Sequence, residues 1–220
     1  MPTTHTVNLE LMTFVEREIL PRYNAFDRAH NLTHALSVIR RSLALARAKG
    51  VDSNMAYVVA AYHDLGMEGP RAIHHLTSGK ILASDQRLHR WFSPQQIDMM
   101  RQAVEDHRAS ASHKPRNVFG LIVAEADRDL SPDVVCRRIV EYGIDHYPEK
   151  TEEEHFERFA DHLKNKYGPN GYIRLWVRDK VNDAHLAELR ALMADSERLR
   201  ETFNSLWAQL HNDNTSSQSS

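Results

Sequence analysis

The stretch AAYHDLGMEGPR, residues 60–71, is the key to how this sequence folds. A short apolar run ends abruptly at His63 and Asp64, and Gly66 follows, where we expect the helix to stop. Imidazole and carboxylate side chains are both common metal ligands. The pair is either the polar end of an ordinary helix or half of a metal site, and the rest of the chain must decide between these interpretations.

Helical spacing of apolar residues extends along the chain in both directions from this stretch. In the first segment, for example, Leu9, Met12 and Val15 form one apolar stripe. Residues 118–130 are so apolar that a buried strand is an alternative there, but no other segment has convincing strand alternation, so the pattern predicts an all-α fold. Helices are predicted over residues 8–20, 32–48, 51–64, 74–84, from 93 onward, 118–130, from 131 onward and 150–167, with one or two long helices over residues 172–211.

The length of 220 residues fits one domain with an appendage. We expect a helical domain over residues 1–148. A helical extension over residues 149–211 would cap the core or form a homodimer contact. The polar residues 212–220 are expected to be a disordered tail.

The composition argues against several classes of protein. The net charge is −2 and no basic stripe is present, which disfavours binding to nucleic acid or to an anionic membrane. Cys136 is the only cysteine, so no internal disulfide can form. The chain has neither a signal-like N-terminus nor an apolar run near the ~20 residues that span a bilayer. We therefore expect a soluble, cytoplasmic protein.

Four residues of types that commonly bind metals each continue an apolar stripe on a different predicted helix: His34, His63, His107 and Asp127. An unpaired carboxylate in a core needs a partner, a proton or a metal ion. One shared cation explains the four residues more economically than four separate buried polar groups. Imidazole with carboxylate suits Mn, Fe, Co, Ni or Zn, and the lack of thiolates excludes a cysteine-type structural zinc site.

The order of these residues resembles the HD-domain superfamily of metal-dependent phosphohydrolases. The segments that carry the resemblance are HNLTHALSVI (30–39), AAYHDLG (60–66) and VAEADRDL (123–130). The resemblance implies an HD-domain-like helical bundle with additional C-terminal helices. It also implies that His34, His63, Asp64 and Asp127 bind one metal ion.

Two further segments are similar to the binuclear branch of the superfamily. In HHLTSGKIL, residues 74–82, His75 stands four residues before Gly79, as a histidine does in that branch. The resemblance implies that His75 and His107 hold a second ion, with Asp64 as the bridge. Alternatively, both histidines support or contact the substrate of a mononuclear enzyme. Both interpretations stay open, with one or two ions.

The resemblance implies hydrolysis of a phosphoester or phosphoanhydride bond in a nucleotide-like substrate. Asp64 would orient the metal ion, and Glu68 or His107 would protonate the leaving oxygen. Cationic side chains beside the motifs are candidates for binding the phosphoryl oxygens. These candidates are Arg71, Lys80, Arg108 and Arg128.

Two other functions remain as alternatives. Some HD-fold proteins are di-iron oxygenases that use the six-ligand arrangement, and others sense a nucleotide without turning it over. The sequence also lacks the features of specialised branches: no Gly-Tyr-Pro extension follows the motif, and Glu68 stands without a second acidic residue. The expected partner is thus a small phosphorylated molecule whose identity the sequence does not specify.

Overall fold

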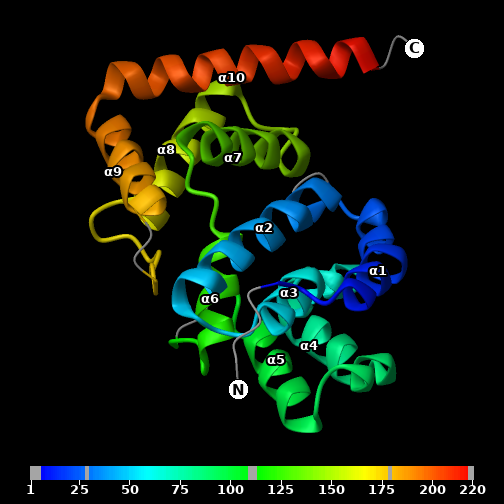
Figure 1. The fold of residues 1–220 in the computed structure, drawn as a ribbon. Coiled ribbons are helices and arrows are strands. Elements are labelled where there is room, and N and C mark those ends of the chain that lie inside the picture. The colour runs from blue at the N-terminus through cyan, green and yellow to red at the C-terminus, as the bar shows by residue number, and fades with distance from the viewer. Residues whose placement is uncertain (1–5, 28–29, 109–112, 178–179, 218–220) are drawn as a thin grey trace. The chain divides into compact units, whose positions relative to one another are not determined.

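The computed structural model describes residues 6–27, 30–108, 113–177 and 180–217 (Figure 1). All regular structure in these ranges is helical, which confirms the predicted all-α fold. The buried-strand alternative for residues 118–130 is wrong, because α6 occupies that segment. The α-helices are α1 (Leu9–Glu18), α2 (Leu32–Lys49), α3 (Ser53–Tyr62), α4 (His74–Ser84), α5 (Pro94–Glu105), α6 (Val118–Asp127), α7 (Pro132–His146), α8 (Glu152–Tyr167), α9 (Lys180–Ala194) and α10 (Ser196–Ser217). Short 3-10 helices are η1 (Leu20–Ala25), η3 (Leu65–Glu68), η4 (Arg71–Ile73) and η5 (Gln86–Arg90).

The helix starts follow from local capping chemistry. Asn31 caps α2 by accepting a hydrogen bond from the backbone N–H of His34 at 3.0 Å. Asp52 caps α3, and Ser93 forms a capping box with Gln96 at the start of α5, where Pro94 occupies the first turn. These side chains satisfy backbone N–H groups that have no partner inside their own helix.

The chain divides into two compact units. The first comprises Met1–Arg128 with Leu175–Val177, and the second comprises Asp129–Arg174 with Arg178–Ser220. The first unit ends at Arg128, whereas the sequence suggested a boundary near residue 148. The difference is α7, which packs on α8 and α10 of the second unit.

In the first unit, α3 lies at the centre of the hydrophobic core. It is buried along its whole length because small and apolar residues cover its entire surface. The helices α2, α5 and α6 all pack against it, and α4 packs on α5 (Figure 1). This arrangement brings the ends of several helices to one place.

In the second unit, α7, α8, α9 and α10 pack on one another around an aromatic core. Phe159 and Phe203 are fully buried there, with ring centroids 5.6 Å apart.

The predicted helical segment 172–211 begins later than expected, because α9 starts at Lys180. The helix α10 continues to Ser217, past the start of the expected tail, since each added helical residue gains a backbone hydrogen bond; residues 218–220 lie outside the described residues.

None of the helices in the described part of the chain has both the length and the apolar character needed to cross a lipid bilayer.

Candidate metal centre

Six histidine and aspartate side chains converge from the ends of five helices in the first unit. His34 lies in the first turn of α2, His63 and Asp64 follow the last residue of α3, and His74 begins α4. His107 and Asp127 complete the set. They lie just beyond α5 and at the last residue of α6.

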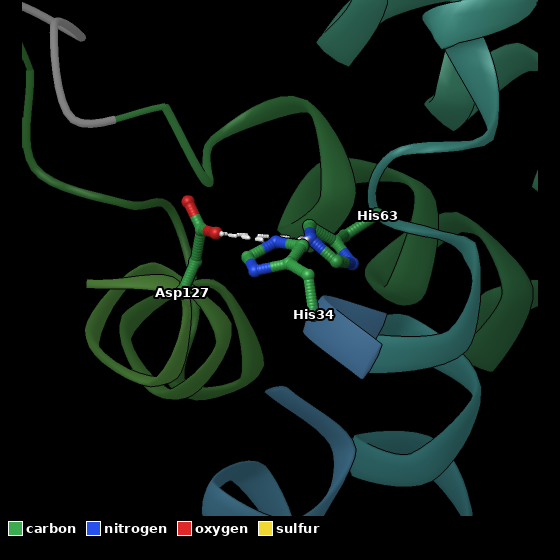
Figure 2. A group of neighbouring side chains, drawn as sticks. All are labelled: His34, His63 and Asp127. Atoms are coloured by element: carbon green, nitrogen blue, oxygen red, sulfur yellow. Dashed lines mark hydrogen bonds and ion pairs between the residues drawn. The ribbon is translucent and has the colours of Figure 1, made fainter. Parts of the chain in front are cut away.

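His34, His63 and Asp127 form the first group. The two Nε2 atoms of His34 and His63 are 3.2 Å apart, and Asp127 Oδ1 lies 3.1 Å from His34 Nε2 and 3.8 Å from His63 Nε2. Figure 2 shows the Asp127 carboxylate directed at the two imidazole rings. One ligand atom from each side chain therefore faces a common point.

Asp64, His74 and His107 form the second group. The Nε2 atoms of His74 and His107 are 3.1 Å apart. Asp64 Oδ1 lies 3.4 Å from each of them. The second group is more enclosed than the first, because His107 and Asp64 are almost completely buried.

Asp64 connects the two groups through its two carboxylate oxygens. Oδ1 faces His74 and His107, whereas Oδ2 lies 3.1 Å from His63 Nε2 and 3.5 Å from His34 Nε2. A carboxylate that presents one oxygen to each of two imidazole pairs has the arrangement of a bridging ligand between two cations.

Backbone hydrogen bonds orient three of the four imidazole rings. The Nδ1 atoms of His63, His74 and His107 lie 2.8, 2.8 and 2.6 Å from the carbonyl oxygens of Ala60, Arg71 and Val104. A carbonyl only accepts, so each Nδ1 carries the proton and each Nε2 is left to bind a cation. In the second group, where both Nδ1 atoms carry protons, the facing Nε2 lone pairs of His74 and His107 repel each other unless a proton or a cation lies between them.

The charges of the centre shift several pKa values. Burial alone would lower the pKa of His34, but Asp127 and Asp64 outweigh burial and raise it to about 9. Burial would raise the pKa of Asp64, but His63 and its neighbours hold it well below the usual range. In the second group, burial and the nearby His107 lower the pKa of His74 to about 4, whereas Asp64 raises that of His107.

This donor set fits divalent metal ions. Two ligand atoms that each lie about 2.1 Å from one ion, at roughly right angles, are about 3 Å from each other. Five of the six spacings within the two groups lie between 3.1 and 3.4 Å, and the sixth, between His63 Nε2 and Asp127 Oδ1, is 3.8 Å. Four imidazole nitrogens with carboxylate oxygens suit Mn, Fe, Co, Ni or Zn better than Ca or Mg, which prefer oxygen.

Comparison with known families bears directly on this site. Residues 31–130 match the family model of the HD domain. This segment is an HD domain. The segment contains all six residues of the two groups. Members of the HD family are generally metal-dependent phosphohydrolases. No curated protein and no solved structure matches the chain.

The second group of this HD domain contains His74 in place of the expected His75. Along α4 the buried positions His74, Ser78 and Leu82 repeat every four residues, which is the helical signal that points to His74. His75 is half-buried beside that face, outside both groups, and its pKa is lowered by burial and by the charge of Arg108. The structure thus brings His74 into this group and leaves His75 outside it, a distinction that the spacing to Gly79 does not make.

Gly66 has a different role from the helix stop that the sequence suggested. Its backbone is not left-handed; among the described residues, only Gly50 has a positive φ. Instead, a Cβ at position 66 would overlap the carbonyl oxygen of His74 and lie 2.7 Å from the amide nitrogen of Ser78. Gly66 thus allows the start of α4 to approach the turn that follows His63 and Asp64.

Glu68 belongs to neither group and forms an ion pair with Arg22. Its carboxylate accepts two hydrogen bonds from the Arg22 guanidinium, at 2.7 and 2.8 Å. Arg22 also lowers the pKa of Glu68, which makes it a poorer proton donor near neutral pH. The other expected acid, His107, is instead buried as a member of the second group.

The four expected phosphate-binding cations occupy different environments. Arg71 and Arg108 lie beside the second group: the Arg71 carbonyl anchors His74, and Arg108 Nη1 donates to the carbonyl of Ala72 at 2.6 Å. Lys80 is exposed farther along α4. Arg128 is buried, with Glu125 Oε2 at 3.8 Å, and burial lowers its pKa.

His30 was not among the site residues expected from the sequence, although HNLTHALSVI begins with it. His30 Nδ1 lies 2.7 Å from Asp27 Oδ1, and its ring contacts the ring of His34 edge-on. The other oxygen of Asp27 lies 3.5 Å from Arg71 Nη1. His30 thus has a carboxylate partner and stands next to the first group. Its four-residue spacing from His34 was the available signal.

Proposed function

We propose that this HD domain is a divalent-metal-dependent phosphohydrolase that cleaves a phosphoester or phosphoanhydride bond of a nucleotide-like substrate. The observation that carries the proposal is Asp64, whose two oxygens face two separate imidazole pairs. One ion would be held by His34, His63, Asp64 and Asp127, and a second by Asp64, His74 and His107. The nucleotide part of the proposal rests on the HD family.

The bound ions would lower the pKa of a coordinated water to near neutrality and polarise a phosphoryl oxygen. Side chains of this protein would determine how the substrate approaches and how its phosphoryl oxygens are bound. Asp127 is the most exposed ligand, with 24% of its side chain accessible against 0% for His63, so substrate would approach on its side. Arg71 and Arg108 are the cations best placed to bind the phosphoryl oxygens.

His30 is the strongest candidate for protonating the leaving oxygen. Its Nδ1 lies 2.7 Å from Asp27 Oδ1, which fixes the orientation of the ring, so that an imidazolium at this position would deliver its proton from Nε2. Glu68, one of the two residues that the sequence suggested for this role, is paired with Arg22. We therefore assign the acid role to His30 within this proposal.

Two properties accompany the proposal as predictions. The expected partner is a small phosphorylated molecule, with no role for nucleic acid or membrane, and the second unit is a candidate homodimer contact. The expected location is the cytoplasm.

The test is turnover by metal-loaded protein on a panel of nucleotides and simple phosphoesters. We expect activity with Mn, Co or Ni that Asp64→Ala abolishes and His74→Ala reduces at least ~10-fold. His75→Ala is the matched control, since the neighbouring side chain lies outside both groups, and it should retain wild-type activity.

Other outcomes distinguish the alternatives. An inert metal-loaded protein, together with an Asp64→Ala variant that binds metal as well as wild type, contradicts the proposal. Iron near two ions per chain with oxygen consumption supports a di-iron oxygenase, whose six ligands this set also provides. A nucleotide that raises the melting temperature without forming product supports a sensor.

A further inference from the structure

Tyr23 contacts the turn that carries His63 and Asp64, although the proposed chemistry does not use it. It lies in η1 and is fully buried. Its hydroxyl donates to the carbonyl of Ala61 at 3.0 Å and accepts from the backbone N–H of Asp64 at 3.4 Å. One hydroxyl thus joins the end of α3 to the residue that bridges the two groups.

The end of α3 explains why these contacts matter. The last carbonyls of a helix lack partners within the helix. At this end, the Ala60 carbonyl is bound by His63 Nδ1 at 2.8 Å, and the Ala61 carbonyl is bound by Tyr23. The first contact orients the ring of His63, and the second holds the backbone from which Asp64 projects.

Neighbouring contacts hold Tyr23 itself in place. Its ring stacks beside that of His63, with centroids 6.4 Å apart, and packs edge-on against Phe26 at 5.3 Å. The adjacent Arg22 binds Glu68 at the far end of the same turn. The segment η1 therefore contacts this turn at two places: Tyr23 bonds its buried side, and Arg22 bonds its exposed side.

We propose that Tyr23 is a positioning residue whose hydroxyl keeps Asp64 shared between the two imidazole pairs. This inference rests on the proposed metal centre. Without the hydroxyl, the ring could still pack, but the Asp64 amide and the Ala61 carbonyl would lose their common partner. Small movements of the Asp64 backbone would then favour one imidazole pair over the other, so binding of two ions together should suffer most.

The test compares Mn²⁺ binding by Tyr23→Phe and by Tyr57→Phe, with the metal-free full-length protein as starting material. Tyr57 is also a buried tyrosine, on α3, and among the described residues the hydroxyl that bonds Ala61 and Asp64 is that of Tyr23. Titration gives the affinity, and electron paramagnetic resonance detects the magnetic coupling of two Mn²⁺ ions that share a bridging ligand. We expect Tyr23→Phe to bind Mn²⁺ roughly 10–100-fold more weakly and to lose the coupled signal at concentrations that saturate wild type. Tyr57→Phe should behave as wild type.

Further measurements separate positioning from a general loss of folding. Circular dichroism and the melting temperature of the metal-free variants report folding, and a large excess of Mn²⁺ should restore the coupled signal in Tyr23→Phe. A Tyr23→Phe protein with wild-type affinity and coupling would overturn the inference. If wild type shows the coupled pair and Tyr23→Phe loses it, but neither hydrolyses any phosphoester, the inference stands and the proposed function fails.

Discussion

At the scale of single residues, binding of metal ions by the two imidazole pairs would replace protons. The facing Nε2 atoms are 3.2 Å apart in the first group and 3.1 Å apart in the second, and such pairs need a proton or a cation between them. In the metal-free protein, His34 holds that proton strongly, because Asp127 and Asp64 raise its pKa to about 9. Metal binding must therefore release protons, and it should weaken as the pH falls.

The raised pKa of His34 predicts a specific pH dependence for the metal-free protein. Its folded pKa lies above the unfolded value of 6.5, so its contribution is fully present below about pH 6.5 and is lost as the pH rises through about 9. The loss is at most about 3 kcal/mol. With a chelator present, the melting temperature of wild type should fall by several degrees between pH 6.5 and 9.5, and His34→Gln should show a smaller fall. Equal falls in the two proteins would contradict this account.

The second group contains a residue that could not be predicted from the sequence. The motif order pointed to His34, His63, Asp64 and Asp127, and the structure brings these four together. The motif order could not separate His74 from His75, because only the buried face of α4 distinguishes these adjacent residues. Similarly, Glu68 appeared free to act until its partner Arg22, distant in sequence, was known.

At the scale of elements, helix positions were predictable because their signals are local. Caps such as Asn31 and Ser93, and breakers such as Pro94, act within a few residues. Which residues of a helix form its buried face is harder to predict. In α1, Leu9 was expected in the core but is 76% exposed, whereas Leu11 is fully buried. Leu11 is four residues from Val15, whereas Leu9 is linked to Val15 only through Met12, and the packing of α1 against its neighbours buries the first of these positions.

The contact between η3 and α4 gives the prediction at this scale. An alanine at position 66 would collide with backbone atoms of His74 and Ser78, which cannot move independently of α4. We expect Gly66→Ala to lower the free energy of unfolding by about 1–3 kcal/mol and to weaken binding of the second ion more than the first. Gly69→Ala is the matched control, since its added Cβ would meet only the Gly66 carbonyl oxygen at 3.7 Å. The measurements are chemical denaturation and Mn²⁺ titration, and equal effects of the two substitutions would count against this role of Gly66.

At the scale of the whole molecule, the division of the chain was the least predictable feature. Residues of α7 have an apolar face, but periodicity does not reveal which unit covers that face. Val140, for example, is buried in the second unit, and sequence analysis grouped it with the first. The candidate metal centre lies within one unit, because all six of its residues precede the boundary at Arg128.

Metal ions should stabilise the fold because their ligands come from helices far apart in the sequence. An ion that binds only the folded chain stabilises it by about 2.7 kcal/mol at 100 times its Kd. For a chain of this size, that corresponds to a rise of roughly 5–10 °C in melting temperature. We expect Mn²⁺, Co²⁺ or Ni²⁺ to produce such a rise in chelator-treated wild type, whereas Ca²⁺, which prefers oxygen ligands, should produce little. The rise should be smaller in His74→Ala, which retains only the first group intact, and nearly absent in Asp64→Ala, because both groups share this carboxylate. A rise in Asp64→Ala as large as in wild type would show that the ions bind elsewhere.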